Sequence, residues 1–195
     1  RHRGPDSRGI WMSQNFGLGH SRLKIIDLSN RANQPFTNGE DVLVFNGEIF
    51  NFKELKKQLP SMEKYKTSSD TEVLFYSLKY WGIDALNKIE GQFAFAFFDK
   101  RSNSLLLARD HVGICPLYIM ENDNELIFSS EIKPILEIRK SSLDSQGILD
   151  YFAYRYNIQN SHTLFSNIKR FPPANYWKID LGKNEIIKNI FIITF

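Results

Sequence analysis

Apolar and polar residues alternate over several short stretches of the chain, in the pattern of strands with one buried face. The stretch Gly9–Ile26 alternates on both sides of Gly17 and Gly19, which predicts two antiparallel strands. Residues 92–99 alternate large and small apolar side chains, as on a strand buried on both faces, and residues 104–109 are predicted to return as its hairpin partner. Further strands are predicted at Leu117–Met120, Glu125–Ser129 and Asn175–Ile179.

Helical patterns stand between these strands in blocks. Asn51 is placed to cap a helix that Pro60 ends. Residues 69–72 (Ser-Asp-Thr-Glu) have the form of a capping box, which predicts a helix from there to Trp81 with Gly82 as its stop. Further helices are predicted at Ile83–Ile89, Glu131–Ile138 and Ser145–Tyr154. Hairpins with helices in blocks, and no βαβ alternation, predict an α+β fold of two antiparallel sheets faced by helices.

One apolar run, Val42–Phe45, is followed directly by Asn46, Gly47 and Glu48. The run predicts a short buried strand, and Asn-Gly favours a positive φ, so the strand is expected to stop at a sharp turn. Such a turn would present an amide, two backbone N–H groups and a carboxylate at the edge of a sheet. Taken alone, the dipeptide is more often a turn without further function.

The chain has 195 residues, of which 42% are hydrophobic and 24% charged, as in a globular protein with one domain or one domain plus a piece of another. The net charge of +3 is not gathered in basic blocks, and no apolar run approaches the ~18 residues of a membrane span, so neither nucleic acid nor a membrane is expected as a partner. A single cysteine fits a reducing compartment, and the cytoplasm is expected. The start at Arg1 without Met and the apolar end from Asn189 to Phe195 predict a fragment.

Five short motifs occur in one order along the first 135 or so residues. Together they resemble the glutamine amidotransferase domain of the N-terminal-nucleophile (class II) family, and most closely that of glutamine-hydrolysing asparagine synthetases. The motifs are His2-Arg3-Gly4-Pro5-Asp6, Gly19-His20-Ser21-Arg22-Leu23-Lys24-Ile25-Ile26-Asp27, Phe45-Asn46-Gly47-Glu48-Ile49-Phe50-Asn51, Ser69-Asp70-Thr71-Glu72, and Ala108-Arg109-Asp110-His111-Val112-Gly113 with Pro116-Leu117-Tyr118.

The resemblance implies a four-layer α-β-β-α sandwich of two antiparallel sheets, the N-terminal nucleophile hydrolase fold, incomplete at its N-terminus. Residues 1–160 would be the amidotransferase domain, and residues 161–195 its end and the start of a connection to an ATP-dependent synthetase domain. The activity implied is hydrolysis of glutamine to glutamate and ammonia, with the ammonia used to amidate aspartate.

Catalysis in the family begins with attack by an N-terminal Cys, whose α-amine serves as the base. This chain begins at a later motif, so it is expected to be inactive alone. The developing oxyanion needs preorganised donors, typically worth ~3 kcal/mol each. By resemblance these donors are the side chain of Asn46 and the N–H of Gly47.

Glutamine binding needs a partner for each end of the amino acid. By resemblance, Arg22 pairs with the α-carboxylate, while Asp70 and Glu48 surround the α-ammonium. The resemblance also implies that the pocket is lined by Leu23, Ile25 and Ile26. It implies no cofactor and no metal for this domain, with ATP and Mg²⁺ used by the synthetase domain. The partners implied are glutamine and the covalently linked synthetase domain, and a homodimer is among the assemblies it allows.

Each of these side chains also has a plainer interpretation. Arg22 without the family context is a solvated charge on a strand, and Glu48 a surface acid. Asp70 at a helix start interacts favourably with the helix dipole, by ~0.3–1 kcal/mol. His20 is expected to form hydrogen bonds rather than to catalyse.

Cys115 lies between Ile114 and Pro116 in an apolar segment, and it is expected to be buried and inert. Arg109-Asp110 is expected to brace its hairpin. Two alternatives to the asparagine synthetase interpretation stay open. One is another class II amidotransferase, of amino-sugar or purine synthesis, and the other is a non-catalytic domain that binds glutamine or a partner.

Overall fold

The structure, a computed structural model, describes residues 3–60, 65–122, 125–156, 161–183 and 185–190. The strands are β1 (Ser7–Met12), β2 (Gly17–Arg22), β3 (Phe36–Asn38), β4 (Asp41–Ile49), β5 (Gly91–Asp99), β6 (Ser104–Arg109), β7 (Tyr118–Asn122), β8 (Glu125–Ser129), β9 (Lys169–Arg170), β10 (Asn175–Asp180) and β11 (Glu185–Ile190). The helices are η1 (Asn30–Ala32), α1 (Phe52–Gln58), α2 (Asp70–Trp81), η2 (Gly82–Asn87), α3 (Ile132–Ile138) and α4 (Ser145–Tyr154), of which η1 and η2 are 3₁₀.

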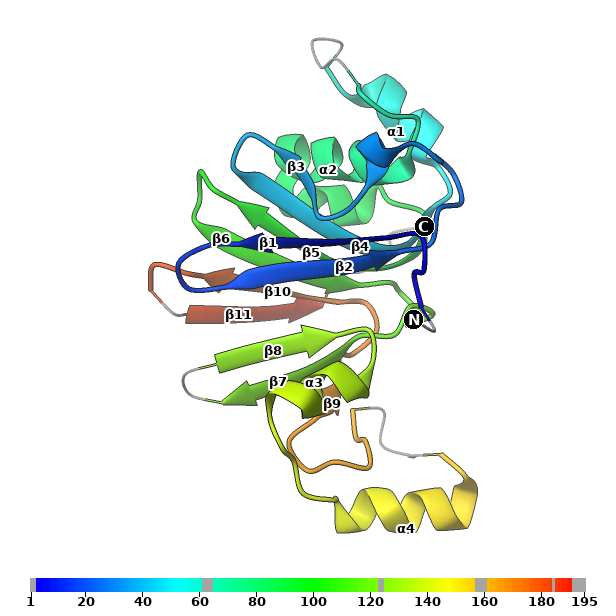
Figure 1. Ribbon diagram of the computed structural model, residues 1–195, viewed down its shortest axis with the longest axis vertical. Coiled ribbons are helices and arrows are strands. Elements are labelled where there is room, and N and C mark those ends of the chain that lie inside the picture. Colours follow the sequence, from blue (N-terminus) through cyan, green and yellow to red (C-terminus); the bar gives the residue numbers. More distant parts are fainter. Residues whose placement is uncertain (1–2, 61–64, 123–124, 157–160, 184, 191–195) are drawn as a thin grey trace.

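The strands form one large antiparallel sheet and two smaller ones (Figure 1). The large sheet has six strands in the order β11-β10-β6-β5-β4-β3. The hairpin β1–β2 and the three-stranded sheet β8-β7-β9 pack against one face, and α1, α2 and η2 pack against the other. Helix α3 packs on the outer side of β7 and β8. The predicted α-β-β-α layering is therefore confirmed, with the second β layer divided into two pieces.

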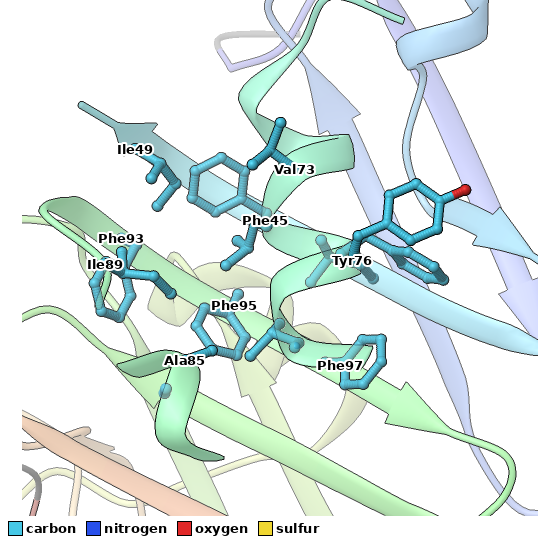
Figure 2. Packing of buried hydrophobic residues seen from close by; sticks show 14 of the residues in the cluster. Phe45, Ile49, Val73, Tyr76, Ala85, Ile89, Phe93, Phe95 and Phe97 are labelled. Atoms are coloured by element: carbon cyan, nitrogen blue, oxygen red, sulfur yellow. The ribbon is translucent and has the colours of Figure 1, made fainter. Parts of the chain in front are cut away.

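Strand β5 separates the two apolar cores, as its alternating side chains predicted. Phe93, Phe95 and Phe97 face the helices and pack with residues of α2 and η2, as Figure 2 shows. The small side chains of Ala94 and Ala96 face the second β layer instead. The alternation of size ends at Phe98, whose ring faces the second β layer together with Ala94 and Ala96.

The helices α1 and α2 begin where the sequence predicted, but the side chains at their starts make other hydrogen bonds than predicted. Helix α2 begins where the capping box predicted, and the Ser69 hydroxyl accepts from the Glu72 N–H over 3.4 Å. The Glu72 carboxylate does not reach back to the cap; it accepts bonds from Lys66 and Thr67 in the preceding segment. Asn51 stands at the cap position of α1 without capping it.

The Asn51 side chain instead joins the start of α1 to the start of β5. Its amide N–H donates to the Lys88 carbonyl over 2.8 Å, and its oxygen accepts from the Glu90 N–H over 3.1 Å. The region from Asn30 to Gly39, for which no strand or helix was predicted, contains the 3₁₀ turn η1 and the short strand β3. Within the described part of the chain, no helix has the length and apolar character needed to cross a membrane.

Candidate functional site

Asn46 and Gly47 lie inside β4 rather than at its end. They stand opposite Ala94 and Phe93 of β5, and the pairing continues to Ile49. The prediction that the strand stops at Asn-Gly is therefore wrong, although the positive φ of Gly47, 145°, is as expected. A Cβ at Gly47 would lie 2.0 Å from the Gln92 carbonyl oxygen, so glycine lets the strand continue close against β5.

The N–H of Gly47 faces away from β5. The flanking residues show this, because the Phe45 N–H donates to Gln34 Oε1 over 2.6 Å and the Ile49 N–H donates to Asp70 Oδ2 over 3.1 Å. Both acceptors lie outside the β4–β5 pair, and the direction of N–H groups alternates along an antiparallel strand. Strand β3 pairs with β4 only at residues 41–43. Gly47 therefore presents its N–H at an open edge of the sheet.

A cavity of about 510 Å³ lies beside Asn46, between the β1–β2 hairpin and the β8–α3 corner. Its floor includes Asn46 and Ala94, and its sides include His20 of β2 and Phe128 of β8. The cavity lies between the two pieces of the second β layer. These pieces are not joined to each other, because among the described strands β2 pairs only with β1 and β8 only with β7. Asn46 is the one predicted site residue in this lining.

Arg22, at the end of β2, is buried and its guanidinium binds the loop that follows. Nη1 donates to the Ser29 carbonyl over 2.9 Å and to Asn33 Oδ1 over 3.0 Å, and Nη2 donates to the Asp27 carbonyl. These bonds use three of the five N–H groups that a guanidinium carries. No carboxylate of a described residue forms an ion pair with it. A buried cation with no anionic partner here is the arrangement that a bound carboxylate would stabilise.

Asp27 connects this loop to the start of α2. Its carboxylate accepts from the Ser29 N–H over 2.8 Å and from the N–H and hydroxyl of Ser68 over 2.8 and 3.2 Å. The hydrogen bonds from Ser68 and Ser29 lower the pKa of Asp27 to about 2. The sequence alone predicts no role for Asp27, because its partner Ser68 is 41 residues away.

Asp70 and Glu48 stand close to one another at the end of β4. The buried Asp70 carboxylate accepts from the N–H groups of Ile49 and Thr71, over 3.1 and 2.8 Å. Burial raises the pKa of Asp70, and the negative charge of Glu48 adds to the rise. Glu48 itself is exposed. Two neighbouring acids, one buried and one exposed, favour the approach of a cation.

Leu23, Ile25 and Ile26 lie outside the strand in which they were predicted. Strand β2 ends at Arg22, because the three bonds of its guanidinium draw residues 27–33 back toward it. The three apolar side chains are exposed, at 58, 73 and 37%. Their place in a glutamine pocket stays a prediction, as do the roles of the other predicted site residues.

A family model described as a glutamine amidotransferase domain matches residues 1–191. The chain belongs to this family. Among curated proteins, a putative glutamine-hydrolysing asparagine synthetase 2 of Methanocaldococcus jannaschii is 33% identical over 96% of this chain and 41% of its own length. Asparagine synthetase 1 of Bacillus subtilis is 32% identical over 100% of this chain and 31% of its own length. The chain thus spans less than half the length of either relative.

The fold agrees with that of solved amidotransferases. The glutamine phosphoribosylpyrophosphate amidotransferase of Bacillus subtilis superposes with a TM-score of 0.61 at 20% identity, over 91% of this chain and 35% of that one. At this identity the likeness concerns the fold alone. The class II amidotransferase fold implied by the five motifs is confirmed.

Cys115 does not have the character of the family's nucleophile. It is buried, and burial raises the pKa of its thiol to about 11 with a further contribution from Asp110. The thiol is therefore protonated at neutral pH, as expected of an inert cysteine.

Arg109 and Asp110 brace the neighbouring loop, each through separate bonds to the backbone. Arg109 donates to the carbonyls of Gly113, Cys115 and Phe171, over 2.6, 2.7 and 2.6 Å. The Asp110 carboxylate accepts from the backbone N–H groups of Phe93, Val112, Ile114 and Cys115. The structural role predicted for the two residues is confirmed.

Proposed function

We propose that, in the intact gene product, this amidotransferase domain hydrolyses glutamine for an asparagine synthetase, and that the ammonia amidates aspartate with ATP and Mg²⁺ bound outside these 195 residues. The observation that carries the proposal is the network from β2 to α2. It joins a buried arginine, which has no anionic partner among the described residues, to a pair of acids, beside an open backbone N–H. Glutamine carries the complementary groups: a carboxylate, an ammonium and a carboxamide.

In this proposal the α-carboxylate of glutamine binds the N–H groups of Arg22 that no described residue accepts. Asp70 and Glu48 receive the α-ammonium, whose positive charge favours the ionised form of Asp70 and so opposes the rise that burial causes in its pKa. The carboxamide then lies toward β4, where the Asn46 amide and the Gly47 N–H stabilise the tetrahedral oxyanion. When such donors are preorganised, each stabilises the transition state by ~3 kcal/mol.

The reaction also needs a thiolate, and Cys115 does not supply one. We therefore propose that the 195-residue chain binds glutamine without hydrolysing it, and that the attacking cysteine reaches the cavity beside Asn46 only in the intact gene product. Mixing the isolated chain with L-glutamine should release no glutamate. Turnover that survives Cys115→Ala would contradict the proposal and point to another nucleophile.

The ammonia acceptor is tested with the intact gene product. With L-glutamine, ATP, Mg²⁺ and L-aspartate, we expect asparagine and glutamate to form together. Product formation with a sugar phosphate or a phosphoribosyl donor in place of aspartate would favour the other amidotransferases. Heat of glutamine binding in calorimetry without glutamate release from any form of the protein would favour a non-catalytic binding domain.

A further inference from the structure

The backbone of Phe45, the residue before Asn46, is held at both of its polar atoms by one side chain. The Phe45 N–H donates to Gln34 Oε1 over 2.6 Å, and Gln34 Nε2 donates to the Phe45 carbonyl over 3.0 Å. Gln34 is 7% exposed and lies 11 residues before Phe45. Its amide occupies the edge of β4 beyond the last residue that pairs with β3. A single side chain there replaces the two bonds that a neighbouring strand would make.

The same carbonyl receives a second donor, from His20 of β2. The distance from His20 Nε2 to the Phe45 oxygen is 3.1 Å, and because a carbonyl only accepts, Nε2 carries the hydrogen. Burial lowers the pKa of His20 to about 4, so the ring is neutral at neutral pH. The tautomer is then fixed, with Nδ1 unprotonated and buried without a partner among the described residues.

The carbonyl of Phe45 and the N–H of Asn46 belong to one planar peptide unit. Because the Phe45 carbonyl accepts from two fixed donors, this peptide plane cannot rotate freely. The orientation of the plane sets the direction of the chain at Asn46. Asn46 and Gly47 follow directly. We propose that Gln34 and His20 are positioning residues, which hold the Phe45–Asn46 peptide so that the Asn46 amide and the Gly47 N–H point at the same oxyanion. This inference rests on the oxyanion role proposed above for those two groups.

The alternative is that the two side chains only satisfy buried backbone atoms. A structural role would lower the folded fraction and leave the kinetic constants of folded molecules alone. A positioning role acts on the transition state, where a small displacement of a donor lowers kcat and leaves substrate affinity nearly unchanged. A loss of kcat in folded molecules without a matching change in substrate affinity therefore indicates a positioning role, and a loss of folded fraction alone indicates a structural role.

The test is steady-state hydrolysis of L-glutamine by the intact gene product, normalised to folded protein by near-UV circular dichroism. Gln34→Glu keeps the acceptor for the Phe45 N–H but places an oxygen against the Phe45 carbonyl. His20→Leu removes the second donor, while His20→Gln can return an N–H₂ to the place of Nε2. Gln58→Glu, at an exposed position of α1, is the matched control.

We expect Gln34→Glu and His20→Leu to lower kcat at least about tenfold, against the 10²–10³-fold typical of losing an oxyanion donor outright, with KM changed less than about threefold. His20→Gln should recover most of the kcat lost in His20→Leu, and Gln58→Glu should behave as wild type. Wild-type kcat in Gln34→Glu and His20→Leu, or equal losses in the Leu and Gln variants of His20, would overturn the inference. If Gln34→Glu does not fold, the two His20 variants decide the question.

Asn46→Ala separates this inference from the function on which it rests. If Asn46→Ala loses kcat and the Gln34 and His20 variants do not, the proposed function stands and the positioning role is refuted. If Asn46→Ala retains kcat, the oxyanion assignment itself is wrong, and the positioning role is refuted with it.

Discussion

Asp70, the first residue of α2, accepts a hydrogen bond of 3.1 Å from the backbone N–H of Ile49, the last residue of β4. The contact fixes the start of the helix against the end of the strand that carries Asn46 and Gly47. The acid is therefore part of the fold as well as a candidate for binding the ammonium of glutamine. The two roles make different demands on its charge, and this difference can be measured.

Asp70→Asn should separate the two roles. Burial raises the pKa of Asp70 above its ordinary value of 3.8. The ionised carboxylate is therefore less stable in the folded chain than in the unfolded chain, and at neutral pH this difference lowers the free energy of unfolding. The amide removes this penalty and keeps one acceptor, so urea denaturation at pH 7 should show a loss of no more than about 1 kcal/mol in the free energy of unfolding.

Glutamine affinity should respond differently to the same change. Without the charge of Asp70 the dissociation constant for L-glutamine in calorimetry should rise at least about tenfold, the effect of about 1.4 kcal/mol. Glu48→Gln, at the exposed neighbouring acid, should raise it less. Unchanged affinity in Asp70→Asn would remove Asp70 from the proposed site.

Arg22→Lys tests whether the fork of the guanidinium is needed. A lysine keeps the positive charge but cannot reach Ser29, Asp27 and Asn33 together, and hydrogen bonds from charged groups are worth ~1.5–3 kcal/mol each. We expect a loss of about 2 kcal/mol or more in stability and at least about tenfold weaker glutamine binding. Arg31→Lys, at an exposed position of η1, is the control and should change neither.

Gly47→Ala should be far more destabilising than Gly39→Ala. Both glycines have a positive φ, 145° and 64°, but a Cβ at Gly47 would meet the Gln92 carbonyl at 2.0 Å while one at Gly39 meets nothing within 4 Å. The conformational cost alone is about 1–2 kcal/mol, and forced displacement of β5 adds about 1–3 kcal/mol. Equal losses in thermal or urea denaturation would show that β4 and β5 separate easily at this point.

The sequence pattern predicted the strand β5 and the helix α2 well because their signals are local. The alternation of Phe and Ala assigns Phe93, Phe95 and Phe97 to one face of β5 whatever packs on it. The helix α2 has a cap at Ser69 and a glycine stop at Gly82, both adjacent in sequence to the residues they affect.

The errors concern contacts between residues distant in sequence. Asn46-Gly47 favours a turn locally, but eight residue pairs with β5, from Val42 to Ile49, hold it in a strand. The sequence predicts no role for Gln34 or Asp27, because no local pattern indicates which backbone group a buried amide or carboxylate will reach. The short strands β3 and β9 are defined by their pairing, with β4 and β7, rather than by their own residues.

His20 predicts a pH dependence of stability near the candidate site. Burial lowers its pKa to about 4 from 6.5, and the nearby charge of Arg22 contributes in the same direction. Between these two values the unfolded chain binds a proton that the folded chain does not, so stability rises with pH across this window. The contribution is fully present above pH 6.5 and should be lost, by about 3 kcal/mol in all, as the pH falls toward 4.

His20→Gln is the variant that isolates this effect, because it keeps a donor near the Phe45 carbonyl and does not titrate. Urea denaturation between pH 7 and 4 should show the wild type losing more stability than His20→Gln, with the difference confined to that window. Asp27 affects stability only at lower pH, because its pKa is lowered from 3.8 to about 2. The stability that its ionised carboxylate contributes is lost only as the pH falls below about 3.8. Parallel curves for wild type and His20→Gln down to pH 4 would mean that the ring is protonated in the folded state, and that the Nδ1 atom has found an acceptor.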